Sequence, residues 1–141
     1  MEVDESLREQ VETWMAHDPD PVTVDDARLL LLADDAPALN DRFASSLQFG
    51  TAGLRGALGA GPNRMNRLVV RRAAAGVADY LLRQDPSAST RGVVIGFDAR
   101  HGSEEFAHDT ARVLAARRVR AFLLPARIPT PVLACGITDL G

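Results

Sequence analysis

An alternation of strand and helix in the last third of the chain constrains the fold more than any other feature. Residues 92–97, GVVIGF, form a short β-branched run typical of a strand buried in a sheet. Residues 119–124 predict a second strand, which Pro125 is expected to close. Helical periodicity lies between the two runs, and the connections are short. Two strands joined in this way pack in parallel with a right-handed crossover, so the sequence predicts an α/β fold.

The segment between these strands begins with a polar loop, Asp98–Gly102, at the carboxyl end of the first strand. Ser103 is expected to cap the following helix, which should run to about Arg117. Arg118 then stands where a helix usually ends on glycine, and the left-handed conformation costs a residue with a side chain about 1 kcal/mol. Because ligands of parallel sheets gather beyond the carboxyl ends of the strands, the Asp98–Gly102 loop is a candidate ligand contact.

Helical patterns dominate the first part of the chain. Apolar spacing predicts a helix over residues 4–16, which a DPDP segment ends because proline cannot donate a backbone hydrogen bond. A second helix is expected from about Thr23 as its N-cap, and a third over residues 38–46. The sequence therefore predicts a helical N-terminal arm over residues 1–46, followed by an α/β domain over residues 47–141.

A longer helix is expected after this arm, with Asn66 as its cap and its end near Gln84. Its first turns carry Arg67, Arg71 and Arg72. Cations at a helix N-terminus oppose the helix dipole unless an anion or a carboxylate lies near. A basic face in contact with water is the favoured interpretation of these arginines, and direct contact with a ligand is the alternative.

The composition is that of a globular domain, with 141 residues, 46% of them hydrophobic and 25% charged. The net charge of −3 gives no basic footprint for nucleic acid. All 16 basic residues are arginine, which excludes lysine-dependent Schiff-base chemistry. Cys135 is the single cysteine, allows no internal disulfide and fits a reducing cytoplasm. With no signal-peptide pattern and no apolar run of membrane-spanning length, we expect a cytoplasmic protein without a membrane partner.

Residues 49–56, FGTAGLRG, combine three glycines with a hydroxyl group and an arginine. Glycine lets a ligand approach the backbone closely, and the N–H groups of such a turn can point together at one oxyanion. Thr51 can donate a further hydrogen bond, and the guanidinium of Arg55 suits a phosphate. The segment is therefore a candidate phosphate site, with a simple glycine turn as the alternative. It is not a P-loop, which needs lysine and then serine or threonine after its last glycine.

Three segments together resemble one known family. FGTAGLRG, followed by Arg64-Met65-Asn66, is similar to the opening motif of the phosphohexomutases, the phosphoglucomutase/phosphomannomutase family. Residues 96–101, GFDARH, are similar to the G-x-D-x-R segment after that family's second core strand. Pro129-Thr130-Pro131 resembles the P-T-P that opens the helix before the catalytic strand. The resemblance covers nearly the whole chain, but only the first of the family's four domains.

The resemblance implies a three-layer α/β/α domain with a mixed, largely parallel sheet. It implies an isomerase that moves phosphate between the 1- and 6-positions of a hexose through a phosphoserine, with Mg²⁺ and a sugar bisphosphate activator. The implied partners are a phosphosugar substrate and the remaining domains of the same polypeptide. The implied site residues are Thr51, Gly53 and Arg55 for the substrate phosphate, with Asp98, Arg100 and His101 in support.

Most of these residues also have a local interpretation. Asp98 can cap its own turn through its carboxylate, and Arg100 can pair with Asp98 or Glu104. His101 provides an imidazole next to the candidate phosphate site. However, the histidine that the family places beside its phosphoserine belongs to another motif. Arg55 is the strongest candidate, since no carboxylate lies near it in the sequence.

The sequence contains no T-A-S-H-N-P motif, whose serine carries the phosphate in the family, and no D-G-D-x-D-R motif for Mg²⁺. We therefore expect no catalytic residue and no metal ligand in the chain, and no mutase activity from these 141 residues alone. Two alternatives stay open: a non-catalytic phosphate-binding or interaction domain, and a gene fragment without a function of its own. The hexose cannot be named, because the family's sugar-reading loop is absent.

Overall fold

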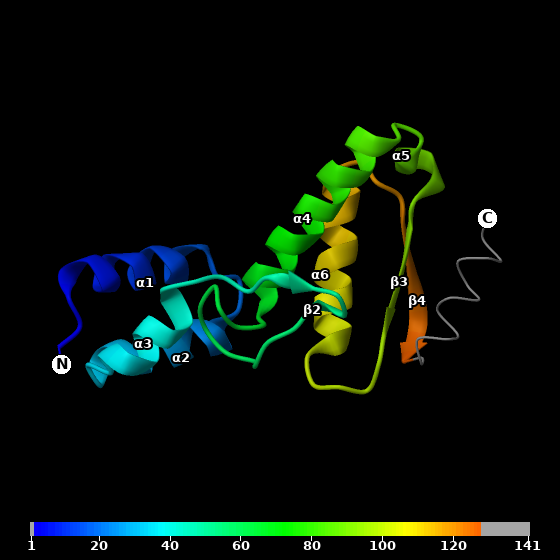
Figure 1. Ribbon diagram of the computed structural model, residues 1–141. Helices are drawn as coiled ribbons and strands as arrows, with labels where there is room; N and C mark the ends of the chain where they lie inside the picture. The colour runs from blue at the N-terminus through cyan, green and yellow to red at the C-terminus, as the bar shows by residue number, and fades with distance from the viewer. Residues whose placement is uncertain (1, 128–141) are drawn as a thin grey trace. The chain divides into compact units, whose positions relative to one another are not determined.

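The computed structural model describes residues 2–127, which belong to two compact units divided after Val69. The first unit contains three helices and a small hairpin, and the second contains a parallel strand pair with its helices (Figure 1). One long helix, α4 (Arg67–Gln84), begins at the end of the first unit and continues into the second. Cys135 and the Pro129–Pro131 segment lie outside the described residues. The expected division into an arm and a domain at residue 46 stays a prediction.

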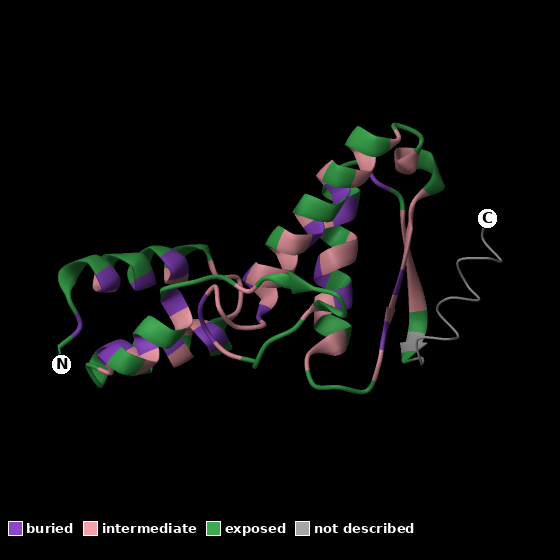
Figure 2. Ribbon diagram, viewed as in Figure 1, coloured by how far each residue is buried: buried purple, intermediate pink, exposed green. Residues whose placement is uncertain are grey.

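Three helices build the core of the first unit: α1 (Glu5–His17), α2 (Pro21–Leu32) and α3 (Ala36–Phe43). Their buried residues alternate with exposed ones along each helix, as Figure 2 shows. Trp14 and Phe43 meet edge to face, with ring centroids 5.7 Å apart. Leu39 and Val11 are fully buried in the same cluster. The apolar spacing of the sequence therefore predicted α1 and its buried face correctly.

The start of α2 differs from the expectation. Asp20, not Thr23, is the N-cap, and its carboxylate accepts a hydrogen bond of 2.9 Å from the backbone N–H of Val22. Pro21 takes the first helical position, where a missing N–H does no harm and the fixed φ favours the helix. The DPDP segment thus ends one helix and begins the next. Thr23 is buried and donates its hydroxyl to the Asp18 carboxylate at 2.5 Å.

The third helix also lies slightly earlier than expected, because Asp35 caps it and accepts from the N–H of Ala38 at 3.1 Å. Asn66 caps α4 as predicted, accepting from the N–H of Val69 at 2.9 Å. Within α4, Arg71 does not belong to a face surrounded by water. Its guanidinium donates to the buried carboxylate of Asp109 at 2.9 and 3.1 Å, so the expectation for Arg71 was wrong.

In the second unit, β3 (Val93–Phe97) and β4 (Ala121–Arg127) pair in parallel, as the strand–helix–strand pattern predicted. They are connected through α6 (Ser103–Ala116), and α5 (Ala88–Arg91) is a short helix that the sequence did not reveal. Ile95 and Phe97 pack with Leu114 of α6 and Ala78 of α4 in one cluster. Both helices lie on the same side of the strand pair (Figure 1). This arrangement is α/β, and the wider three-layer sheet stays a prediction.

Two details of the second unit correct the expected boundaries. Pro125 lies within β4 and does not end it, and the pairing with β3 slips there, with Ile95 opposite Leu123 but Phe97 opposite Arg127. Proline has no N–H to donate to the ladder, so it fits where the register is irregular. Ser103 is the first residue of α6, and Gly102 is the cap.

Arg118 takes the left-handed conformation at the end of α6, with φ of +60°, as the sequence indicated. The backbone N–H of Val119 donates to the carbonyl of Leu114 at 2.9 Å, and that of Arg118 to Ala115 at 3.0 Å. These two bonds and the buried pair of Val119 and Leu114 form a Schellman motif. The motif turns the chain directly from α6 into β4.

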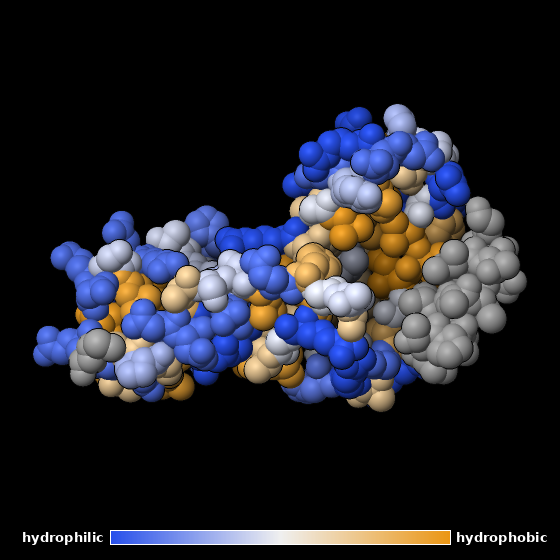
Figure 3. All heavy atoms as spheres, in the orientation of Figure 1, coloured by the Kyte–Doolittle hydropathy of each residue, from blue (hydrophilic) through white to orange (hydrophobic). Residues whose placement is uncertain are grey.

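Several large apolar side chains of the described residues are exposed, and apolar surface is visible in the space-filling view (Figure 3). On α2 these are Val22, Leu29 and Leu32, and on α4 they are Val77 and Tyr80. Within residues 2–127, no helix is both long enough and apolar enough to cross a membrane.

Candidate functional site

The glycine-rich segment forms a small antiparallel hairpin in the first unit. Its strands are β1 (Phe49–Gly50) and β2 (Gly53–Leu54), with Thr51 and Ala52 as the turn. Gly53 has φ of +97°, a conformation that favours glycine, and no atom lies within 4 Å of the position that a Cβ would take. The turn is exposed, so its backbone is open to a ligand.

Arg55 directly follows β2, and it is exposed. Its guanidinium makes no hydrogen bond or ion pair with any residue in the range 2–127. Two other arginines of this unit are paired: Arg42 donates to Asp26 at 2.5 Å, and Arg64 pairs with Asp41. The charge of Arg55 is therefore available to an anion from solution, as its isolation from carboxylates in the sequence suggested.

The loop that follows the hairpin is held by the side chain of Asn66, which is only 2% exposed. Its amide nitrogen donates to the carbonyl oxygens of Gly59 at 2.9 Å and Gly61 at 2.8 Å. Gly61 has φ of +106°, and a Cβ there would lie 2.7 Å from the carbonyl oxygen of Arg42. Only glycine fits this close approach.

Asp26 of α2 provides a second anchor for this loop. One of its carboxylate oxygens accepts from the backbone N–H of Ala60 at 2.9 Å and from Arg42 at 2.5 Å. No local pattern in the sequence indicates this role, because Asp26 and Ala60 are 34 positions apart. Asp26 and Asn66 thus hold the loop over residues 59–61 that follows the hairpin, and the hairpin turn itself is exposed.

The three supporting candidates, Asp98, Arg100 and His101, lie together in the second unit, in the loop after β3. The Asp98 carboxylate accepts from the backbone N–H of Arg100 at 3.0 Å and from its guanidinium at 2.7 Å. These two hydrogen bonds hold the pKa of the Asp98 carboxyl below its ordinary value. Ser103 accepts a hydrogen bond of 3.2 Å from the N–H of Asp98, which ties the loop to α6. Asp98 thus caps its own turn and pairs with Arg100, as the local interpretation of these two residues predicted.

These candidates line an open depression at the carboxyl ends of β3 and β4, together with charged side chains that the sequence analysis missed. Arg127 comes from the end of β4 and Arg112 from α6. Arg127 stands at the end of its strand as Asp98 stands at the end of the neighbouring one. The rule for parallel strands could therefore have identified it. His101 is exposed at the rim.

The two candidate groups belong to different units, Thr51, Gly53 and Arg55 to the first and Asp98, Arg100 and His101 to the second. Across the part of the chain that the structure describes, no group of three or more His, Cys, Asp or Glu side chains could hold a metal ion.

Comparison with known proteins gives one family and several relatives. The sequence model described as "Phosphoglucomutase/phosphomannomutase, alpha/beta/alpha domain I" matches residues 46–141. A "Probable phosphoribomutase" of Schizosaccharomyces pombe is 38% identical over 99% of the chain and 24% of its own length. A "Phosphoglucomutase" of Staphylococcus haemolyticus is 39% identical over 70% of the chain and 17% of its own length. A "Phosphopentomutase" of Mus musculus is 32% identical over 98% of the chain and 23% of its own length.

The chain thus spans about a quarter or less of the length of these curated relatives. No solved structure matches it.

Proposed function

Because the chain belongs to the phosphoglucomutase/phosphomannomutase family, we propose that it is the first domain of a phosphosugar mutase. In the parent enzyme, phosphate would move between the 1- and 6-positions of a hexose by way of a phosphoserine. The substrate would be a hexose 1-phosphate or 6-phosphate, with a sugar bisphosphate as activator. Mg²⁺ would be held by other domains of the same polypeptide, where it would neutralise phosphate charge.

A pentose phosphate is a second candidate substrate. The relatives from S. pombe and M. musculus, which match 99% and 98% of the chain, are named a phosphoribomutase and a phosphopentomutase. The shorter match to a phosphoglucomutase favours the hexose. The described residues include no sugar-reading loop, so both sugars are compatible with the first domain.

The observation that carries the proposal is the exposed, unpaired guanidinium of Arg55 next to an open glycine turn. Its planar fork of donors can hold two oxygens of one phosphate, and the hydroxyl of Thr51 can donate to a third. Gly53 has no side chain and no atom lies within 4 Å of the position that a Cβ would take, so a ligand can approach the backbone there. These three residues would bind and orient the phosphate of the substrate.

Asp98, Arg100 and His101 have a supporting role in this proposal. The Asp98 carboxylate already satisfies two donors of Arg100. Arg100 would therefore shape the loop and orient neighbouring groups, and His101 would contribute to the polar rim. None of the three is proposed to exchange a proton with the substrate.

Two arginine variants in the complete enzyme test these roles. We expect Arg55→Ala to lower turnover roughly 30- to 1000-fold, since a lost charged hydrogen bond to a transferring phosphate removes about 2–4 kcal/mol. Arg100→Ala should lower it only a few-fold, because an exposed ion pair contributes about 0–1 kcal/mol. Melting temperatures of both variants serve as the control for folding. Equal losses of turnover, or a larger loss in Arg100→Ala, would contradict the proposal that the substrate phosphate binds at Arg55.

The 141-residue chain by itself should show no mutase activity on glucose 1-phosphate or ribose 1-phosphate, because it has no T-A-S-H-N-P serine. A coupled assay of the purified chain measures this. Turnover that is abolished by Arg55→Ala in the isolated chain would contradict the proposal.

A further inference from the structure

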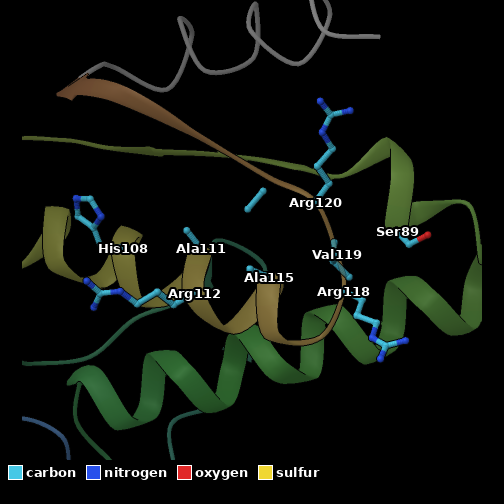
Figure 4. Close-up of a pocket in the computed structure, with 9 residues that line it drawn as sticks. Ser89, His108, Ala111, Arg112, Ala115, Arg118, Val119 and Arg120 are labelled. Atoms are coloured by element: carbon cyan, nitrogen blue, oxygen red, sulfur yellow. The ribbon is translucent and has the colours of Figure 1, made fainter.

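A groove in the second unit lies between α6 and the start of β4 (Figure 4). Small side chains form its floor, and arginines stand around its rim. The small lining residues are Ala111, Ala115 and Ala121, and the arginines are Arg112, Arg118 and Arg120. The groove is open to solvent, and its volume is about 590 Å³.

None of the nine residues that line the groove is acidic, although the chain as a whole has a net charge of −3. Arg118 and Arg120 form no ion pair with any residue that the structure describes. The nearest carboxylate to Arg112 is Asp109 at 3.8 Å, which already accepts two hydrogen bonds from Arg71. Arg120 places its guanidinium over the ring of Phe122, 4.7 Å from the ring centroid, which leaves its charge without a carboxylate partner. The groove therefore carries more positive charge than the carboxylates near it balance.

The backbone of Arg118 adds an independent observation. It occupies the left-handed position of the Schellman motif, where glycine is the favoured residue. Compensation of the helix dipole does not require an arginine at this strained position. Arg117, one residue earlier and without positive φ, already places a cation at the end of α6 and pairs with Asp79 at 2.5 Å. Stability alone thus gives no reason for a cationic side chain at position 118.

The three arginines come from different segments and do not converge on one point. In Figure 4, Arg112 stands toward one end of the groove and Arg118 toward the other, with Arg120 on the strand side. An anion with several phosphates in series can reach more of these exposed guanidiniums than a single phosphate can. We propose that this groove binds an extended polyphosphate anion, at a site that adjoins the depression lined by Asp98, Arg100 and His101 and shares Arg112 and His108 with it.

Titration of the full chain with inorganic phosphate, pyrophosphate and tripolyphosphate tests this proposal by calorimetry and by amide chemical shifts. We expect affinity to rise with the number of phosphates, by at least tenfold from phosphate to tripolyphosphate, and to fall as salt is added. The amides that shift should lie within residues 111–121. Shifts confined to residues 49–56 or 98–102 would overturn the proposal and would instead assign the anion to the substrate loops.

Arg118→Gly separates binding from folding, because glycine relieves the left-handed strain. We expect this variant to melt at an equal or higher temperature and yet to bind tripolyphosphate several-fold more weakly. Arg118→Gly combined with Arg120→Ala should lose at least tenfold. Arg83→Ala removes the same charge from an exposed arginine outside the groove, and it should keep the affinity within twofold.

Two results would contradict the proposal. The first is wild-type tripolyphosphate affinity in the Arg118→Gly, Arg120→Ala double variant. The second is tighter binding of a glutamate-rich peptide than of tripolyphosphate at the same salt concentration, which would assign the groove to an acidic protein segment.

Discussion

At the scale of single residues, Asn66 links the glycine-rich segment to α4. Its buried amide donates to the carbonyls of Gly59 and Gly61 and accepts from the N–H of Val69. Asn66→Ala removes these three bonds, one of which is the helix cap. We expect the free energy of unfolding to fall by about 2–3 kcal/mol. Urea denaturation followed by the fluorescence of Trp14, the single tryptophan, measures this change within the same unit.

Asn63→Ala is the matched control. Asn63 also donates its amide to a backbone carbonyl, that of Asp41 at 2.9 Å, but this bond is exposed. Its loss should lower the free energy of unfolding by less than about 1 kcal/mol. Similar losses for both variants would mean that the burial of Asn66 does not matter.

At the scale of elements, the ion pair between Arg71 and Asp109 joins α4 to α6. Asp109 has no exposed side-chain surface, and Arg71 keeps 35% of its own. Asp109→Ala leaves a half-buried cation without this partner. We expect a loss of about 3 kcal/mol, the lower end of the range for buried pairs because Arg71 is partly hydrated. Denaturation followed by circular dichroism measures the loss.

The control removes a comparable but exposed ion pair. Asp79→Ala breaks the pair with Arg117, which joins the same two helices at their other ends, and should cost about 0–1 kcal/mol. The double variant Arg71→Met, Asp109→Leu should recover most of the stability lost in Asp109→Ala, since an apolar pair needs no charge balance. If the double variant recovers no stability, the ion pair contributes more to the free energy of unfolding than apolar packing at these two positions does.

The elements that the sequence predicted well are those with local signals. Apolar spacing lies within α1 and α4, the cap Asn66 adjoins its own helix, and the β-branched run lies within β3. Arg118 took its left-handed conformation because the end of α6 needs it whatever the residue. Pro21 shows the limit of such signals, since a proline can stop one helix or begin another depending on the cap before it.

The candidate site was less accessible to sequence reasoning. The exposure of Arg55 followed from its local surroundings, but the anchoring of its loop by Asp26 did not. The pairing of Arg71 with Asp109 spans 38 positions, and the arginine pattern at the start of α4 is the same whether or not a carboxylate lies opposite. Contacts of this kind depend on the packing of elements, which periodicity does not specify.

At the scale of the whole molecule, α4 is the element that both units share. Leu68 belongs to the apolar cluster of the first unit, and Ala78 to that of the second. Ala75→Pro interrupts the helix between them, which costs about 3 kcal/mol or more. We expect the unfolding transitions followed by Trp14 fluorescence and by circular dichroism to coincide in the unmodified chain and to separate in this variant.

The control is Ala75→Gly, which costs about 1 kcal/mol and should leave the two transitions coincident. Coincident transitions in Ala75→Pro would show that α4 does not couple the two units.

The ion pair of Arg71 and Asp109 also bears on how such chains diverge. Loss of Asp109 leaves the half-buried guanidinium of Arg71 without this partner, and loss of Arg71 leaves the buried carboxylate of Asp109 with Arg112 at 3.8 Å, whereas two simultaneous apolar changes are closer to neutral. Evolution can therefore replace this ion pair by apolar residues only through a less stable single variant or through two substitutions at once. Among related proteins, an apolar residue at position 109 should accompany an apolar residue at position 71, and a mixed pair should be rare.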